Sequence, residues 1–200
     1  TADVRHVDGS SEYVVRKIHR AHELDHGMVV FSGGEPTLRP EIFEWAALVA
    51  SLGLDVGLVT NGLLLAYPDV LERLLARRLR YVYMSLHGVG RIHDRLVRTD
   101  DASVAAFKAV QNLSGRGMDL TINCVVTPQN VEHLVPLVDA MLPYPDLRLK
   151  FSMVHPKGRG ESLFDVVTAR VSEVAPAVVA AIRHGQEGVR ARGASGPTFG

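Results

Sequence analysis

A glycine pair followed by an acid stands directly after a short apolar run. Residues 28–31 are apolar, and Gly33, Gly34, Glu35 and Pro36 follow within a few positions. The run has the length and composition of a strand buried in a parallel sheet. Glycines let a ligand approach the backbone closely, and a carboxylate binds a cationic group such as ammonium. The pattern therefore predicts a strand-end loop that binds a ligand, with an ordinary strand-to-helix turn and a solvated Glu35 as the alternative.

Polar residues also end the other predicted strands. Ligands of α/β sheets and barrels bind beyond the carboxyl ends of the strands. Besides Glu35, the polar residues at such places are Thr60, Asn61, Ser85, His87, Asn123, Thr127, His155 and Lys157. We expect the functional side chains to come from this set.

Several of these residues have a structural alternative. Asn61 and Gly62 form a common turn pair. Ser85 could hydrogen-bond the local backbone, and His87 could bond a neighbouring loop. Asn123 lies inside an apolar strand, where either a cofactor or another strand-end group could satisfy its amide. His93, with Asp94 after it, could begin a short helical turn and be held by a carboxylate.

The single cysteine limits the metal chemistry. One thiol, Cys124, excludes an internal disulfide and is too few for an iron–sulfur cluster, which takes three or four thiolates. Its position inside a strand is typical of a small buried hydrophobe. His19, His22 and His26 share one face of a predicted helix, but no second motif supplies the remaining ligands of a zinc site. We therefore name no metal ligand.

A repeating β/α pattern positions these residues. Strands are predicted to begin near residues 28, 54, 80, 119 and 147, with helices between them and a last helix over 168–184. This repeat suits parallel strands joined by right-handed crossovers. The first predicted element is a helix, over 11–25, so we expect a strand to be missing upstream. Residues 185–200 are rich in Gly, Arg and Ala and are predicted to be a linker or disordered tail.

In chain order the motifs resemble those of radical S-adenosylmethionine (radical SAM) enzymes. GGEP at 33–36 resembles that family's signature after its second barrel strand, and TNG, SLHG with a following HDR, and INCVVTPQN come next in the family's order. The resemblance implies an α/β fold over residues 1–184: a partial (β/α)6 TIM-like barrel of radical SAM type, lacking its first strand. A fragment of a closed (β/α)8 barrel is the alternative. The resemblance also implies that S-adenosylmethionine (SAM) is bound through Gly33, Gly34, Glu35, Pro36, Asn61, Ser85, His87 and Asn123.

The implied activity is that of the family. A [4Fe–4S] cluster reductively cleaves SAM to a 5′-deoxyadenosyl radical, which abstracts hydrogen from a substrate. The substrate is an unknown small molecule or peptide, and the electron donor is a protein such as flavodoxin or ferredoxin. No side chain is named as catalytic, since the cofactor performs the abstraction. The family's CxxxCxxC loop is absent from this sequence. We expect an N-terminally truncated core that is inactive alone.

Two other functions stay open. The first is a relative without the cluster that serves as a binding or scaffold protein. The second is a barrel lyase or isomerase that uses Glu35 and His87 as acid and base.

Composition favours a globular domain. Hydrophobic residues make up 46% of the 200-residue chain, and 22 Lys and Arg balance 22 Asp and Glu. The zero formal charge gives no sign of a nucleic-acid or anionic-membrane partner. No apolar run approaches the roughly eighteen residues of a membrane span, so we expect a cytoplasmic protein.

Overall fold

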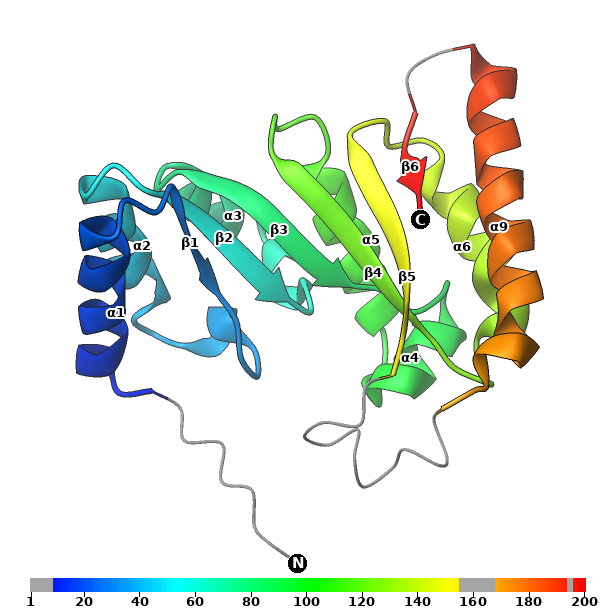
Figure 1. Ribbon diagram of the computed structural model, residues 1–200, viewed down its shortest axis with the longest axis horizontal. Helices are drawn as coiled ribbons and strands as arrows, with labels where there is room; N and C mark the ends of the chain where they lie inside the picture. The colour runs from blue at the N-terminus through cyan, green and yellow to red at the C-terminus, as the bar shows by residue number, and fades with distance from the viewer. Residues whose placement is uncertain (1–8, 155–167, 194–195) are drawn as a thin grey trace, which may run out of the picture.

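The computed structural model describes residues 9–154, 168–193 and 196–200. His155 and Lys157, which the sequence predicts at the end of a strand, lie outside these residues. The described residues form one open sheet with helices packed against it (Figure 1).

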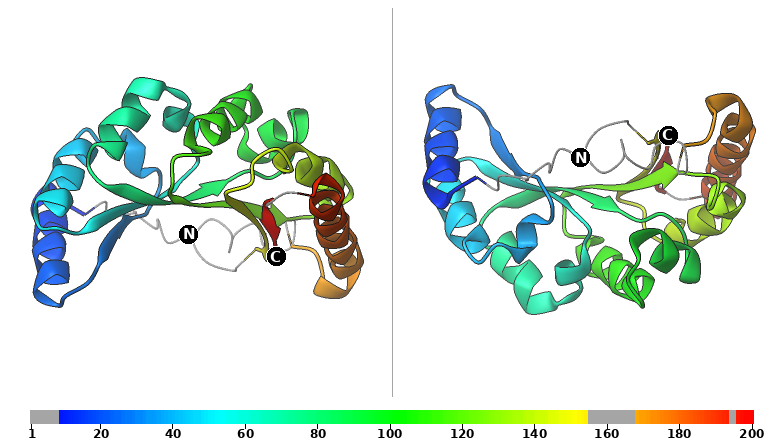
Figure 2. Two further views of the ribbon diagram at one scale, coloured as in Figure 1. Left: turned by 90° about the horizontal axis from the view of Figure 1, so that it is seen from above. Right: turned by 90° about the horizontal axis from the view of Figure 1, so that it is seen from below.

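All strands of this sheet are parallel and follow one another in chain order. They are β1 (Met28–Phe31), β2 (Asp55–Thr60), β3 (Leu79–Ser85), β4 (Asp119–Val126), β5 (Leu147–Met153) and β6 (Thr198–Phe199). The strand β1 pairs only with β2, and β6 only with β5, in the described residues. Seen along its edge in Figure 2, the sheet bends into an arch. This arrangement confirms the predicted parallel α/β sheet and partial barrel.

The helices cover one face of the sheet. They are α1 (Ser11–Glu23), α2 (Ile42–Ser51), α3 (Pro68–Leu75), α4 (Arg91–Val97), α5 (Ala102–Leu113), α6 (Leu134–Met141) and α9 (Val171–Arg192). Short 3-10 helices are η1 (Pro36–Leu38), η2 (Leu63–Ala66) and η3 (Val131–His133). Figure 2 shows α2 to α6 on the outer face of the arch and α1 and α9 at its two ends, whereas no described helix covers the inner face.

Successive side chains along each strand point alternately to the two faces of the sheet. Met84, Ile122 and Leu149 lie in one register row across β3, β4 and β5, and all three are fully buried under the helices. Because successive residues of a strand point to opposite faces, the residue after each of these points to the inner face. The apolar core therefore lies between the sheet and the helices, and polar side chains of the central strands face the inside of the arch.

The C-terminal segment differs from the predicted linker. Residues 185–192 continue α9, and β6 pairs with β5. A Cβ on Gly185 would lie 2.7 Å from the Phe199 ring, and one on Gly188 would lie 2.9 Å from Leu142. The glycines that make this segment look like a linker instead allow α9 to pack closely on β6 and α6.

Ser10 is the N-cap of α1, because its hydroxyl accepts a hydrogen bond from the Tyr13 amide at 3.2 Å. No helix in the described part of the chain is long and apolar enough to cross a membrane. Among the same residues, no group of three His, Cys, Asp or Glu side chains is placed to hold a metal ion.

Candidate functional site

The Glu35 carboxylate joins the loop after β1 to the end of β2. Its Oε1 accepts hydrogen bonds from the Thr37 amide at 3.1 Å, the Thr37 hydroxyl at 2.5 Å and the Thr60 hydroxyl at 2.7 Å. Its Oε2 accepts one from the Asn61 amide at 2.6 Å. Each carboxylate oxygen has two lone pairs, so Oε2 keeps one acceptor position. Glu35 is therefore not a solvated acid: it caps η1 and fixes the two loops to each other.

The glycine pair before Glu35 leaves its backbone open. Gly33 and Gly34 are both exposed, and a Cβ at either would meet no atom within 4 Å. Gly33 has a φ of 147°, which glycine adopts far more readily than other residues. Pro36 is buried and begins η1. The loop thus offers accessible backbone groups beside a fixed carboxylate.

The Asn61-Gly62 pair forms a tight turn, and the side-chain amide nitrogen of Asn61 is left out of it. Asn61 Oδ1 accepts a hydrogen bond from the Leu63 amide at 3.0 Å, and Gly62 has a φ of 79°. A Cβ on Gly62 would lie 2.1 Å from the Met84 sulfur, so the turn requires glycine. The Asn61 Nδ2 group makes no hydrogen bond with the described residues and stays available to a ligand.

His87 is neutral and held by the backbone. The Val125 amide donates to His87 Nδ1 at 3.2 Å, so the neutral ring carries its proton on Nε2. Burial, followed by the nearby His93, lowers the pKa of His87 to about 4. His93 Nδ1 in turn accepts a hydrogen bond from the His87 amide at 3.1 Å. A backbone amide thus holds His93, which lies in the first turn of α4 as the structural alternative predicted, and no carboxylate hydrogen-bonds it among the described residues.

Asn130 joins the loops that follow β3 and β4, a role that was not predicted from the sequence. It is fully buried, and its Nδ2 donates to the carbonyls of His87 at 2.8 Å and Val125 at 2.9 Å. Its Oδ1 accepts from the Thr127 amide at 2.8 Å and from the Thr127 hydroxyl at 3.2 Å. The turn composition TPQN was the available signal. Thr127 is therefore a structural partner of Asn130.

Ser85, Asn123 and Lys150 form one row across the inner face of the sheet. Ser85 pairs with Asn123, and Asn123 pairs with Lys150. The Ser85 hydroxyl makes no hydrogen bond with the described residues. Asn123 is only 7% exposed, yet its Oδ1 has no partner there. Such an orphan acceptor costs about 1–3 kcal/mol, so Asn123 is a position where a bound donor would be stabilised. Lys150 was missed because an isolated lysine in a strand reads as a solvated residue.

These groups meet along one edge of the arch. The strands β1 to β5 point the same way, so the loops that follow them gather at the lower edge in Figure 1. Glu35 links the first two loops, and Asn130 links the next two. The structure therefore brings together the predicted residues of β1 and β2 and, separately, those of β3 and β4, at adjacent strand ends.

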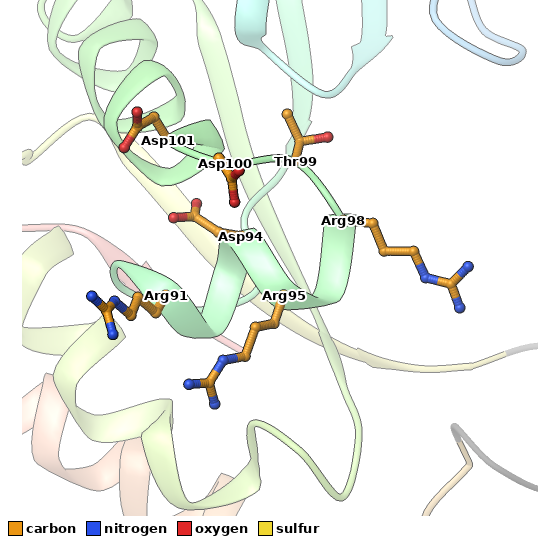
Figure 3. Close-up of a pocket in the computed structure, with 7 residues that line it drawn as sticks. All are labelled: Arg91, Asp94, Arg95, Arg98, Thr99, Asp100 and Asp101. Carbon is orange, nitrogen blue, oxygen red and sulfur yellow. The ribbon is translucent and has the colours of Figure 1, made fainter.

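A hollow of about 540 Å³ beside α4 holds none of the predicted site residues. Its lining residues are Arg91, Asp94, Arg95, Arg98, Thr99, Asp100 and Asp101. Figure 3 shows the three arginine side chains pointing away from the aspartates. Asp94 is already engaged, because its Oδ1 accepts a hydrogen bond from the Ser103 amide at 2.7 Å. Because charges of both signs line this hollow and its side chains point apart, we assign no ligand to it.

Cys124 is unsuited to metal binding. The side chain is fully buried on the helix-facing side of β4, and burial raises the pKa of its thiol to about 12. The Asn130 amide contacts its sulfur at 3.7 Å. It matches the predicted buried hydrophobe.

Comparison with curated proteins finds relatives that are enzymes by name. Mycofactocin maturase MftC of Mycolicibacterium smegmatis is 32% identical over 147 residues, which cover 72% of this chain and 37% of the relative. PqqA peptide cyclase of Xanthomonas campestris is 30% identical, with 72% of this chain and 38% of the relative covered. AdoMet-dependent heme synthase of Methanosarcina barkeri is 28% identical, with 71% and 41% covered. The chain spans about two fifths of the length of these relatives.

Solved structures share the fold. Streptococcus suis SuiB bound to S-adenosylmethionine aligns with a TM-score of 0.69 at 18% identity, over 93% of this chain and 42% of that one. The protein anSMEcpe with bound AdoMet and Kp18Cys peptide aligns with a TM-score of 0.70 at 18% identity, over 94% and 54%. The model of the Radical SAM superfamily matches residues 2–141. With this match, the open parallel arch and the GGEP loop tied to the second strand, the chain belongs to the radical SAM superfamily.

Proposed function

We propose that this chain forms the SAM-binding part of a radical SAM enzyme. The observation that carries the proposal is the GGEP loop, locked by Glu35 to the end of β2 inside a matched radical SAM domain. The curated relatives at about 30% identity are enzymes by name, which supports the same class of activity here.

The free polar groups at the strand ends suit the methionine and ribose parts of SAM. The open backbone of Gly33 and Gly34 and the remaining acceptor position of Glu35 Oε2 would bind its α-ammonium group. Donors for its carboxylate and hydroxyl oxygens are Asn61 Nδ2 and His87 Nε2. Ser85 offers a hydroxyl that both donates and accepts, and the orphan Asn123 Oδ1 accepts from a ligand hydroxyl or amine. Pro36 holds the loop in position as the first residue of η1.

In this family the reduced cluster and SAM together supply a carbon-centred radical that removes a hydrogen atom from the substrate. The residues named above would bind and orient SAM, and neutral His87 would do so without adding a charge. The side chains of this chain do not fit the cluster itself. A [4Fe–4S] cluster takes three or four thiolates, whereas the sequence has one cysteine and its thiol is buried with a raised pKa. A cluster would need thiolates from outside these 200 residues.

That mismatch favours one second candidate, a cluster-free protein that uses the same strand ends to bind a ligand. The two candidates share the binding residues and differ in iron content. They are therefore separable by composition before any substrate is known.

A peptide is the first substrate class that we would test. The descriptions of three matched proteins mention a peptide: PqqA peptide cyclase, SuiB bound to precursor peptide SuiA, and anSMEcpe bound to Kp18Cys peptide. A small molecule is the alternative, and a flavodoxin or ferredoxin is the proposed electron donor.

The test uses the protein that the native gene produces, purified and reconstituted without oxygen. SAM binding by isothermal titration should weaken about tenfold in Asn123→Ala, the effect of losing one hydrogen bond of about 1.4 kcal/mol. Lys108→Gln, an exposed change on α5, is the control and should bind normally. About four irons per monomer with SAM binding would establish the enzyme, and SAM binding without iron would establish the cluster-free protein. A folded protein that binds no SAM at millimolar concentration would refute the SAM site and, with it, the radical SAM enzyme.

A further inference from the structure

A cavity of about 380 Å³ opens on the inner face of the arch, next to the row that contains Asn123 and toward the starts of the strands. Its lining residues are Tyr81, Tyr83, Thr121, Arg148, Lys150 and Gly200. Register confirms that these strand residues share one face, since Tyr83 pairs with Thr121 and Thr121 pairs with Arg148. No described helix covers this face (Figure 2). The cavity is separate from the α4 hollow and from the strand-end loops.

The side chains around the cavity carry one net positive charge. Arg148 Nη1 lies 3.5 Å from Asp119 Oδ1, so its charge is partly balanced, and it also donates to the Thr121 hydroxyl at 3.3 Å. Lys150 has no ion pair with any described residue. Two cationic side chains and one acidic side chain leave a single unit of positive charge, which matches a carboxylate better than a phosphate dianion. A flexible lysine at the rim can reach such a group while keeping its stem on the sheet.

The two tyrosines suit the rest of such a ligand. Burial, and then the neighbouring Tyr81, raises the pKa of Tyr83, so its phenol stays protonated and donates a hydrogen bond near neutral pH. The rings also provide apolar walls for a short hydrocarbon stem. An acidic side chain has both parts, a one- or two-carbon stem and a terminal carboxylate.

The cavity adjoins the site proposed for SAM. Lys150 pairs with Asn123 in the sheet, and neighbouring strands lie about 4.8 Å apart. We propose that the cavity between Tyr83 and Lys150 binds a carboxylate of the substrate, the side chain of an acidic residue in a peptide. The inference rests on the proposed function, because it takes the neighbouring row to be the SAM site. Lys150 would then determine the specificity for an acidic side chain in the substrate.

The test is a nuclear magnetic resonance titration of the protein that the native gene produces, with three probes and no cluster required. The probes are an acetylated and amidated alanine tripeptide with a central glutamate, the same tripeptide with a central glutamine, and inorganic phosphate. We expect the glutamate peptide to bind about tenfold more tightly than the glutamine peptide, as for one charge-assisted hydrogen bond. Amide shifts should cluster at Tyr83, Thr121 and Lys150.

The matched variants are Lys150→Met and Lys108→Met. Each removes one exposed lysine, and only the first is expected to abolish the preference for glutamate. Equal binding of the two peptides, tighter binding of phosphate, or an unchanged preference in Lys150→Met would overturn the proposal. SAM is titrated separately into the protein that the native gene produces. Normal SAM binding with no glutamate preference refutes this inference alone, whereas absent SAM binding refutes the proposed function first.

Discussion

Replacement of Glu35 by glutamine should destabilise the fold, because the carboxylate serves four donors at once. Glutamine can keep an oxygen at the Oε1 position, but its amide nitrogen then faces the Asn61 amide, which donates across 2.6 Å in the parent. The reverse orientation places the nitrogen against the Thr37 amide, whereas the Thr37 and Thr60 hydroxyls can turn to accept from it. Either orientation loses the charge and sets the glutamine nitrogen against one backbone N–H, which costs about 2–3 kcal/mol.

The free energy of unfolding of Glu35→Gln is measured by urea titration followed by circular dichroism. With a slope of about 2 kcal/mol per molar, the urea midpoint should fall by about 1 M. Glu132→Gln is the matched control, because Glu132 is exposed and its carboxylate makes no hydrogen bond with the described residues. A Glu35→Gln midpoint equal to that of Glu132→Gln would refute the idea that this carboxylate joins the two loops.

Three further predictions concern titration and packing. The pKa of His87 is about 4 when folded and about 6.5 when unfolded, so the unfolded state binds the proton first. The free energy of unfolding should fall by up to about 3 kcal/mol as pH drops from about 6.5 to about 4. In His87→Gln the urea midpoint should depend less on pH across that range. Gly62→Ala should cost about 2 kcal/mol more than Gly117→Ala, since both have positive φ but only Gly62 lies against the buried Met84 side chain; equal urea midpoints would contradict this. Cys124, with a pKa raised to about 12, should not react with a disulfide reagent at pH 8 until urea unfolds the chain; rapid labelling of the folded chain would show that the thiol is accessible.

The sequence alone determined the strand-and-helix order and the family. Short apolar runs, glycine-containing turns and helical periodicity are local signals, so they placed β1 to β5 close to where the structure has them. The N-cap at Ser10 is equally local. The order of GGEP, TNG, SLHG and INCVVTPQN along the chain identified the superfamily that the domain match then showed.

Only the tertiary structure decided what these residues contact. Glu35 finds Thr60 and Asn61 some 25 residues away, because β1 and β2 are neighbours in the sheet. The row that joins Asn123 to Lys150 depends on strand register, which sequence spacing does not encode, since loop lengths between strands vary. The tail was misread because glycine content cannot distinguish a flexible linker from a helix that needs small residues to pack closely, as Gly185 does against β6. Composition and spacing describe each segment by itself, whereas partners and burial follow from which segments the fold places side by side.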